Sequence, residues 1–281
     1  MNFTKNNIYN TVKDFSVSGE SFSLLLNEEY QILKTDPQPS LEKLPSYYES
    51  EDYISHTDGK RTLFEKMYHL VKKSAIQKKV NLLSKYNTKG SVLDIGAGTG
   101  DFLIAAKKSD WNTTGIEPSG KAKKIAIDKG VSFENSLADL KNESFDVITM
   151  WHVLEHVPNL EFQIAELKRL LKPNGTIIIA VPNFKSYDAK YYKSFWAAFD
   201  VPRHLWHFSK KGIDLLFQKQ NMKLIKVKPM WFDSFYVSLL SEKNKNGKMN
   251  FIKGFFIGFI SNCVGIIKKE YSSHIYIIKK H

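Results

Sequence analysis

Cysteine is almost absent from this chain of 281 residues. Its one cysteine, Cys263, excludes a disulfide within the chain and a zinc ribbon built from cysteines. The first residues, MNFTKNNIYN, are polar where a signal peptide has an apolar core. No uncharged apolar run reaches the length of a membrane span. We therefore expect a cytoplasmic protein.

Acidic residues are also scarce, 29 against 41 basic ones, which gives a formal net charge of +12. Such a charge favours an acidic partner, which would be nucleic acid, anionic lipid or an acidic metabolite. The lysines are scattered, however, and no arginine-and-aromatic recognition pattern accompanies them. We therefore favour a lysine-rich surface over a nucleic-acid-binding protein. The length suits one large domain with extensions, or two small domains.

The most informative stretch is VLDIGAGTG, residues 92–100. Residues 92–95 indicate a short buried strand, and residues 101–108 have helical spacing. Between them, three glycines alternate with small residues. Glycine is needed where a backbone bends sharply or approaches a ligand closely, and the helix behind the turn offers free N–H groups. A strand, a glycine turn and a helix in that order predict a nucleotide-type binding site.

The residues around the turn favour one ligand. A dinucleotide site has the pattern G-x-G-x-x-G beneath a pyrophosphate. Here Asp101 stands in the third glycine's place, where its carboxylate would repel that group. Asp94, before the first glycine, suits a ligand with a cationic ammonium group, such as S-adenosylmethionine. VLDIGAGTG is similar to the first motif of the class I S-adenosylmethionine-dependent methyltransferases.

The resemblance to this family covers residues 92–183 and implies the fold. Short apolar or alternating runs predict strands at residues 92–95, 112–117, 131–135, 144–150, 176–181, 223–228 and 274–280. A helical pattern over residues 60–86 precedes the first strand. By resemblance, the fold is α/β, a Rossmann-like seven-stranded mainly parallel sheet with helices on both faces and a C-terminal antiparallel hairpin. The implied strand order is 3-2-1-4-5-7-6, with the ligand over the C-terminal strand edges.

The candidate cofactor residues gather at these strand ends. They are Asp94, Gly96, Ala97, Gly98, Gly100, Glu117, Ser136, Leu137, Met150 and Trp151. Glu117 ends the second strand, where an acid can accept both ribose hydroxyls of an adenosine through bonds worth roughly 1.5–3 kcal/mol each. The resemblance implies that Ser136 and Leu137 lie beside the adenine. Asn135 and Ser136 replace the acid that the family usually has there.

The candidate catalytic residues follow the fourth strand. The run VLEHV and the later LKRLLKPNGTIIIAVPN are similar to the subgroup that includes ubiquinone-biosynthesis O-methyltransferases. We predict that His156 takes a proton from an acceptor hydroxyl, because a neutral imidazole is a suitable base near pH 7. Glu155 would orient it or bind a divalent ion, and His204 is an alternative base from the other side of the pocket.

Residues 152–156 also spell H-x-x-E-H, the pattern of inverted zinc peptidases. We do not favour a metal site, because the pattern directly follows a strand of the glycine-turn sheet and no distant third ligand is evident. For His152 and His207, packing or an internal hydrogen bond explains the residue at least as well as catalysis does.

The N-terminal part, residues 1–59, precedes the expected methyltransferase domain of residues 60–281. It contains one candidate strand, at residues 22–26, and the acidic, aromatic segment YYESEDY at residues 47–53. Relatives often carry a similar segment before the core, so this extension is expected either to cover cofactor and substrate or to pack its tyrosines on the surface.

Two further segments extend the core of residues 88–183. Residues 184–208 are rich in aromatic side chains and predict either a substrate cap or a small satellite core. Residues 230–270 predict a helical insertion before the last strand. Within it, residues 251–267 would form an interfacial membrane helix or, as we prefer, a helix packed across the C-terminal hairpin through its glycines.

The resemblance implies methyl transfer from S-adenosylmethionine to a small-molecule or lipid-like acceptor, most simply at oxygen and by in-line displacement. Orientation of the reactants can supply roughly 7–11 kcal/mol of the barrier, and no metal is required. A nicotinamide-dependent oxidoreductase and a non-catalytic scaffold stay open as alternatives. Asp101 argues against the first, and the intact Asp94, glycine turn and Glu117 argue against the second. No feature of the sequence indicates an oligomeric state.

Overall fold

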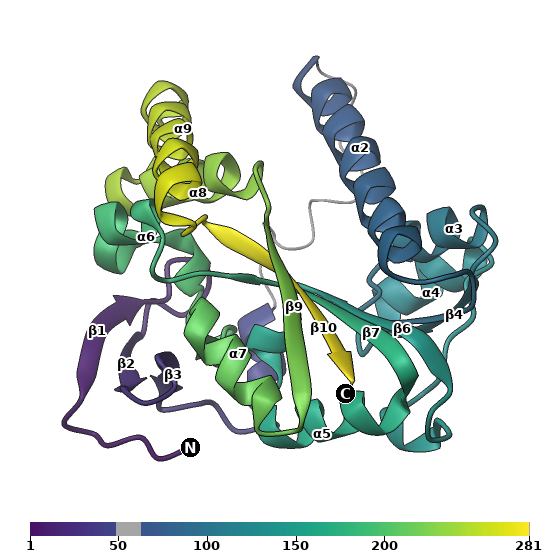
Figure 1. Cartoon of the computed structure of the whole chain (residues 1–281). Coiled ribbons are helices and arrows are strands. Elements are labelled where there is room, and N and C mark those ends of the chain that lie inside the picture. The colour runs from purple at the N-terminus through teal and green to yellow at the C-terminus, as the bar shows by residue number, and fades with distance from the viewer. Residues whose placement is uncertain (49–62, 281) are drawn as a thin grey trace.

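A six-stranded sheet forms the centre of the protein (Figure 1). The computed structural model describes residues 1–48 and 63–280. The strands are, in spatial order, β5 (Asn112–Ile116), β4 (Ser91–Ile95), β6 (Phe145–Trp151), β7 (Leu171–Pro182), β10 (Ser273–Lys280) and β9 (Met222–Pro229). The first four pair in parallel, and β10 pairs antiparallel with both of its neighbours. The mainly parallel sheet and the terminal hairpin are thus confirmed.

The expected third strand, residues 131–135, is wrong as a full strand. It forms one parallel bridge, between Phe133 and Gly115 of β5, so the sheet has six strands rather than seven. The ring of Phe133 packs directly on Gly115, where a Cβ would lie only 2.7 Å from the ring. The polar neighbours Ser132 and Glu134 are exposed. The segment packs Val131 and Phe133 against the core and leaves its other side chains exposed, so longer pairing would bury little more.

Helices cover both faces of the sheet. On one face lie α2 (Leu63–Tyr86), α3 (Asp101–Lys107) and α4 (Gly120–Asp128), and on the other lie α5 (Leu160–Leu170) and α7 (Lys210–Gln218). Successive side chains of a strand point to opposite faces. In β7, Ile177 and Ile179 therefore pack in the core with α5 and α7, whereas Ile178 and Ala180 pack in the core with α2, α3 and α4. Of the predicted helix at residues 60–86, residues 60–62 lie outside the described residues.

The N-terminal residues form a second, antiparallel sheet, which the sequence pattern largely missed. Its order is β1 (Ile8–Lys13), β2 (Ser21–Asn27), β3 (Ile32–Asp36) and β8 (Trp206–His207), and only β2 was predicted. The short η1 helix, Leu44–Tyr48, follows it. The remainder of the segment at residues 47–53, from residue 49 on, lies outside the described residues.

The aromatic segment at residues 184–208 packs under this second sheet. It forms α6 (Tyr187–Tyr192) and the short helices η5 (Lys193–Phe195) and η6 (Ala197–Phe199). The buried rings of Phe184, Tyr192, Trp196 and Phe199 share one core cluster with apolar residues of β1, β2 and β3, whereas those of Trp206 and Phe208 pack in the core of the central sheet. Of the two predicted alternatives, a substrate cap and a small satellite core, this arrangement corresponds to the satellite core. A role of the segment as a substrate cap stays a prediction.

The predicted helical insertion is present as α8 (Asp233–Asn246) and α9 (Phe251–Lys268), which rise beside each other at one end of the molecule (Figure 1). A Cβ on Gly254 would meet Leu239 of α8 at 2.9 Å, and one on Gly258 would meet Phe235 at 2.8 Å. Close packing through glycines is therefore confirmed, but the partner is α8. By length and composition α9 could also cross a bilayer, and 33% of it is buried in the fold.

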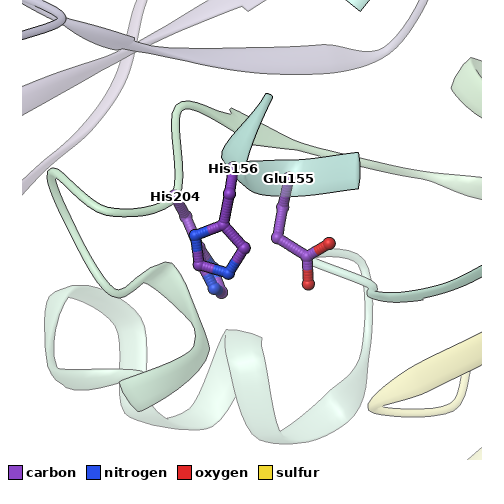
Figure 2. A group of neighbouring side chains, drawn as sticks. All are labelled: Glu155, His156 and His204. Carbon is purple, nitrogen blue, oxygen red and sulfur yellow. The ribbon is translucent and has the colours of Figure 1, made fainter. Parts of the chain in front are cut away.

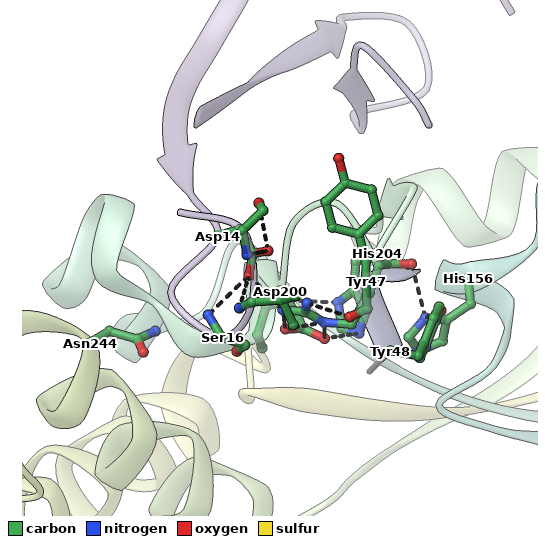
Figure 3. Close-up of polar contacts among 12 residues, drawn as sticks. Asp14, Ser16, Tyr47, Tyr48, His156, Asp200, His204 and Asn244 are labelled. Carbon is green, nitrogen blue, oxygen red and sulfur yellow. Dashed lines mark hydrogen bonds and ion pairs between the residues drawn. The ribbon is translucent and has the colours of Figure 1, made fainter. Parts of the chain in front are cut away.

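A buried ion pair joins the N-terminal sheet to the loop before β8. Arg203 and Asp14 are almost fully buried, and the guanidinium donates to Asp14 Oδ1 at 3.1 Å and to Asp200 Oδ1 at 2.6 Å. A second amino group of Arg203 donates to the carbonyl of Tyr47 at 2.9 Å. Figure 3 shows how these contacts bring Asp14, Tyr47 and Asp200 around one point. The N-terminal sheet is thereby tied to the loop that carries His204.

We expect Arg203→Met to lower the free energy of unfolding by about 3–5 kcal/mol, because it leaves a buried carboxylate without its partner. Urea denaturation at pH 7 measures this change. The matched control is Lys219→Met, which breaks an exposed pair with Glu161 and should cost less than about 1 kcal/mol. Adding Asp14→Asn to Arg203→Met should recover part of the loss. Equal losses in the two single variants would contradict the proposed role.

Candidate functional site

The glycine turn between β4 and α3 has the backbone that its residues require. Gly96, Gly98 and Gly100 have φ angles of 72°, 54° and 77°, a region that side chains disfavour. A Cβ on Gly96 would lie 2.4 Å from Val153, and one on Gly100 would lie 2.9 Å from Ala126. A Cβ on Gly98 would meet nothing within 4 Å. The outer two glycines thus serve packing, whereas Gly98 borders open space in which a ligand can approach the backbone.

Glu117 binds the turn from the end of β5. Its Oε2 accepts the N–H of Gly98 at 2.8 Å, and its Oε1 accepts the N–H of Ser119 at 2.8 Å. The neighbouring N–H of Ala97 is held by the carbonyl of Ile116 at 3.1 Å. Each carboxylate oxygen has a second lone pair. Glu117 can therefore accept hydroxyl groups of a ligand while it stays fixed to the turn.

Asp94 is a buried carboxylate at the end of β4. It accepts the hydroxyl of Thr149 at 2.6 Å. Burial raises the pKa of Asp94 to about 7, although the Thr149 hydrogen bond and the charge of Lys79 oppose the shift. A carboxylate with so little compensation is well suited to bind a cationic group, because pairing would relieve the cost of its burial.

Trp151 follows at the end of β6, with Lys79 of α2 above its ring. The ammonium of Lys79 lies 4.4 Å from the ring centre, and the ring of Phe102 packs edge-on at 5.6 Å. Burial lowers the pKa of Lys79, and the charges of Asp94 and Asp233 only partly offset this. Met150, the preceding residue, is fully buried in the core on the other face of the sheet. A cofactor role for Met150 and Trp151 stays a prediction.

Ser136 and Leu137 begin a short helix, η3 (Leu137–Asp139). The N–H and hydroxyl of Ser136 both donate to Asp139, at 3.1 and 2.9 Å. Arg169 fixes the helix from below by donating to the carbonyl of Leu137 at 2.8 Å. The turn is therefore well defined, with Asp139 supplying a carboxylate close to the place where the family's acid is missing.

A second cluster lies just beyond β6 and contains all three predicted catalytic residues. Glu155 and His156 belong to the short helix η4 (Leu154–His156), and His204 comes from the loop before β8. One ligating atom of each of the three side chains lies within 4.8 Å of the others (Figure 2). The two imidazole rings meet edge to face at 4.6 Å. The fold thus unites residues that are far apart in the sequence.

The hydrogen bonds of the two histidines leave one nitrogen of each ring as a base. His156 Nδ1 lies 3.0 Å from the carbonyl oxygen of Arg203, and His204 Nδ1 lies 2.9 Å from that of Ala198. A carbonyl can only accept, so each neutral ring carries its proton on Nδ1 and has its lone pair on Nε2. Burial, aided by the charge of His156, lowers the pKa of His204 to about 4. His204 is therefore neutral at pH 7.

Glu155 is held by His152, which in turn contacts Asp233 of α8. His152 Nδ1 lies 3.3 Å from Glu155 Oε1, and its Nε2 lies 3.1 Å from Asp233 Oδ2. Burial alone would lower the pKa of His152, but its two carboxylate partners raise it to about 10. Burial alone would raise the pKa of Glu155, but the hydrogen bond to His152 outweighs burial and lowers this pKa. His152 is thus a cation that positions Glu155, and it is not a base at pH 7.

The other oxygen of Glu155, Oε2, is buried without a hydrogen-bond partner. Together with His156 and His204 it offers one carboxylate and two imidazoles, a donor set that suits a divalent transition metal as well as proton transfer. Among the described residues this is the group that could hold an ion. The helix that the H-x-x-E-H pattern needs does not form, since η4 is a single turn and His152 precedes it with a φ of 59°.

Four residues at the site were not predicted as such. The hydroxyl oxygen of Tyr48 lies 3.0 Å from His156 Nδ1 and can accept from its N–H (Figure 3), so the N-terminal extension reaches the cluster. Lys79 and Asp233 approach from helices whose sequence shows only helical spacing. Arg203 stands next to His204, and its role was hidden because its partner Asp14 is distant in the sequence.

Similarity to known proteins agrees with this geometry. The family model described as a methyltransferase domain matches residues 67–227, more than half of the chain. The chain is 35% identical over 106 residues to a ubiquinone biosynthesis O-methyltransferase of Actinobacillus pleuropneumoniae, which is 33% of this chain and 45% of that protein. It is 31% identical over 118 residues to a demethylmenaquinone methyltransferase of Staphylococcus aureus, which is 36% of this chain and 49% of that protein. The chain spans about half the length of the curated relatives it matches.

Solved structures share the fold. A SAM-dependent methyltransferase from Thermotoga maritima aligns with a TM-score of 0.54 at 21% identity, covering 77% of this chain and 95% of that one. Magnesium protoporphyrin IX methyltransferase from Synechocystis, with bound SAH, aligns with a TM-score of 0.53 at 16% identity, covering 85% and 94%. These matches do not favour a nicotinamide-dependent oxidoreductase. From its first motif, its sheet and the match over residues 67–227, we conclude that the chain belongs to the class I S-adenosylmethionine-dependent methyltransferases.

Proposed function

We propose that the protein transfers a methyl group from S-adenosylmethionine to the oxygen of a small or lipid-like acceptor. The observation that carries this proposal is that two carboxylates and a histidine cluster lie along one edge of the central sheet. Asp94 and Glu117 lie at the ends of β4 and β5, and the cluster of Glu155, His156 and His204 follows β6 directly. A cofactor site and a base therefore lie at neighbouring strand ends.

The residues at the turn fit this cofactor. Asp94 would hold its ammonium group, since burial has left the carboxylate in need of a positive partner. Glu117 would accept its ribose hydroxyls, and the open space at Gly98 admits it to the backbone. When bound, S-adenosylmethionine would supply a methyl group on a positively charged sulfur. The sulfur is left as a neutral thioether once the acceptor oxygen has taken the methyl group.

The second cluster would remove the acceptor's proton. His156 Nε2 takes the hydroxyl proton as the oxygen–carbon bond forms, and Glu155 stabilises the resulting imidazolium through its unpaired Oε2. His204 is the alternative base, because it is neutral and shares the cluster. We propose that no metal is needed, since imidazole and carboxylate already complete a proton-transfer pair.

The named relatives support an acceptor of this kind. One is an O-methyltransferase of ubiquinone biosynthesis, and the other is a methyltransferase named for demethylmenaquinone. We extend from these names only the broad class, a small acceptor that is partly apolar. The intact turn and the complete catalytic cluster speak against a non-catalytic scaffold.

We expect S-adenosylmethionine to bind about tenfold more weakly at pH 6 than at pH 8. Below a pKa of about 7, Asp94 must lose a proton before it can pair with the ammonium group. Isothermal titration calorimetry across this range measures the effect. In Asp94→Asn, the affinity for S-adenosylmethionine should fall and its pH dependence should disappear. Without ligand, this variant should melt at pH 8 at a temperature no lower than that of the wild type, because it no longer buries a desolvated charge.

Two controls isolate the ammonium contact. Methylthioadenosine has no ammonium group, so its affinity should depend on neither pH nor the Asp94→Asn substitution. Asp101→Asn removes a turn carboxylate that pairs with Lys129 at 2.7 Å, and it should keep the affinity for S-adenosylmethionine. The assignment of Asp94 fails if both nucleosides respond alike.

We expect His156→Asn to lower kcat by about 10²–10⁴-fold at pH 7 and to leave the affinity for S-adenosylmethionine unchanged, because the base is lost and the cofactor site is not. A prenylated catechol is a suitable first acceptor. The residual rate should rise with pH as the acceptor hydroxyl ionises by itself. Tyr48→Phe, which removes only the hydroxyl beside the His156 ring, should change kcat less than tenfold.

An undiminished rate in His156→Asn would assign proton removal elsewhere, with His204 the first residue to test. Loss of wild-type activity on dialysis against a chelator, restored by a divalent ion, would instead make the cluster a metal site and contradict the metal-free mechanism.

A further inference from the structure

The polarity of α9 is inverted with respect to an ordinary surface helix. The side turned to the protein is mostly small or polar. Its buried residues are Gly254, Gly258, Ser261, Asn262 and Gly265, together with one large apolar residue, Ile257. The side turned outward carries large apolar ones. Its exposed side chains are Phe251, Ile252, Phe255, Phe256, Phe259, Ile260, Ile266 and Ile267. A helix of a water-soluble domain normally buries its apolar stripe and exposes polar residues.

The inward side of α9 is already used by the fold. Its glycines allow the close approach to α8 described above, Ser261 donates to buried Asp188 at 2.6 Å, and Asn262 donates to the carbonyl of Trp231 at 2.9 Å. The helix therefore cannot turn its apolar side inward without breaking these contacts. An exposed apolar face of this size on a fixed element marks an interaction surface.

Charge around this face indicates the chemistry of its partner. Residues 231–269 contain six lysines and two acidic residues. Both acids face inward: Asp233 pairs with His152, and Glu242 is buried beside Lys253. The exposed lysines lie toward the ends of α8 and α9, at Lys243, Lys245, Lys248, Lys268 and Lys269. An aromatic face between cationic ends is complementary to an anionic lipid surface, where rings enter the headgroup region and lysines meet phosphates.

We propose that α8 and α9 form a docking element for the surface of an anionic phospholipid bilayer, with α9 lying in the interface. An interfacial position suits α9 better than a spanning one, because its inner side packs on α8 through glycines and is hydrogen-bonded to Asp188 and to the carbonyl of Trp231. Lipid suits the face better than a second copy of this chain, because like copies would bring the same lysine-rich ends together.

The position of the docking element relates it to the catalytic cluster. Asp233, the first residue of α8, contacts His152 at 3.1 Å, and His152 holds Glu155. Docking would thus bring the cluster close to the bilayer, where a lipid-like acceptor is dissolved. The inference itself rests on the exposed face and its charge, and it holds whether or not the protein transfers methyl groups.

Sedimentation with lipid vesicles tests the proposal on the full chain. We expect the wild type to sediment with vesicles of phosphatidylcholine and phosphatidylglycerol in a 7:3 ratio, and far less with phosphatidylcholine alone. The double variant Phe255→Ser, Phe256→Ser should reduce binding at least tenfold. The matched control is Phe162→Ser on α5, whose ring is 59% exposed, as Phe256 is. This control should sediment as the wild type does.

A second double variant, Ile252→Ser with Ile267→Ser, changes the two most exposed apolar side chains of α9 and should also lose binding. The thermal shift caused by S-adenosylhomocysteine, measured for every variant, shows whether the fold and the cofactor site persist. It also separates failure of docking from failure of the proposed function. Absence of sedimentation with the anionic vesicles would overturn the proposal. So would a wild-type dimer in light scattering that both double variants abolish, since the face would then bind a second copy.

Discussion

The buried contact of Arg203 with Asp14 and Asp200 is the constraint that ties the N-terminal sheet to the loop carrying His204. A guanidinium removed from water is stable only where carboxylates and carbonyls surround it, so its partners have little freedom to move. His204 follows Arg203 in the chain, and the backbone carbonyl of Arg203 accepts a hydrogen bond from His156. One buried cation therefore fixes the N-terminal sheet, the loop before β8 and the orientation of two imidazole rings.

Asp94 shows the opposite use of burial. Its carboxylate has a hydroxyl partner but no direct ion pair, and its raised pKa expresses the cost. Such a group stabilises a bound cation more than an exposed one would, because the ligand removes a penalty that the free protein bears. The two buried acids, Asp14 and Asp94, thus differ in role because one has its cation within the fold and the other needs it from a ligand.

Local patterns predicted what depends on local geometry. The turn at Gly96, Gly98 and Gly100, the paired Glu155 and His156, and most strands could be found because spacing along the chain sets them. The third strand was predicted wrongly because pairing at a sheet edge depends on a neighbour, and this segment packs Val131 and Phe133 on the core while it forms a single bridge. Asp14 and Asp233 gave no signal, and Tyr48 gave only that of the aromatic segment around it, since each acquires its role through a residue far away in sequence.

The helix α9 shows where sequence reasoning reaches its limit for a surface. Composition revealed an apolar helix with glycines, and both a packed and an interfacial position agreed with it. In the structure, Gly254 and Gly258 pack against α8 on one side of this helix, while Phe255 and Phe256 are exposed on the other side. Mostly small residues inside and aromatic ones outside is the arrangement that the proposed docking to lipid would use. A site for a partly apolar acceptor and a face for lipid would then be parts of one device, joined through Asp233 and His152.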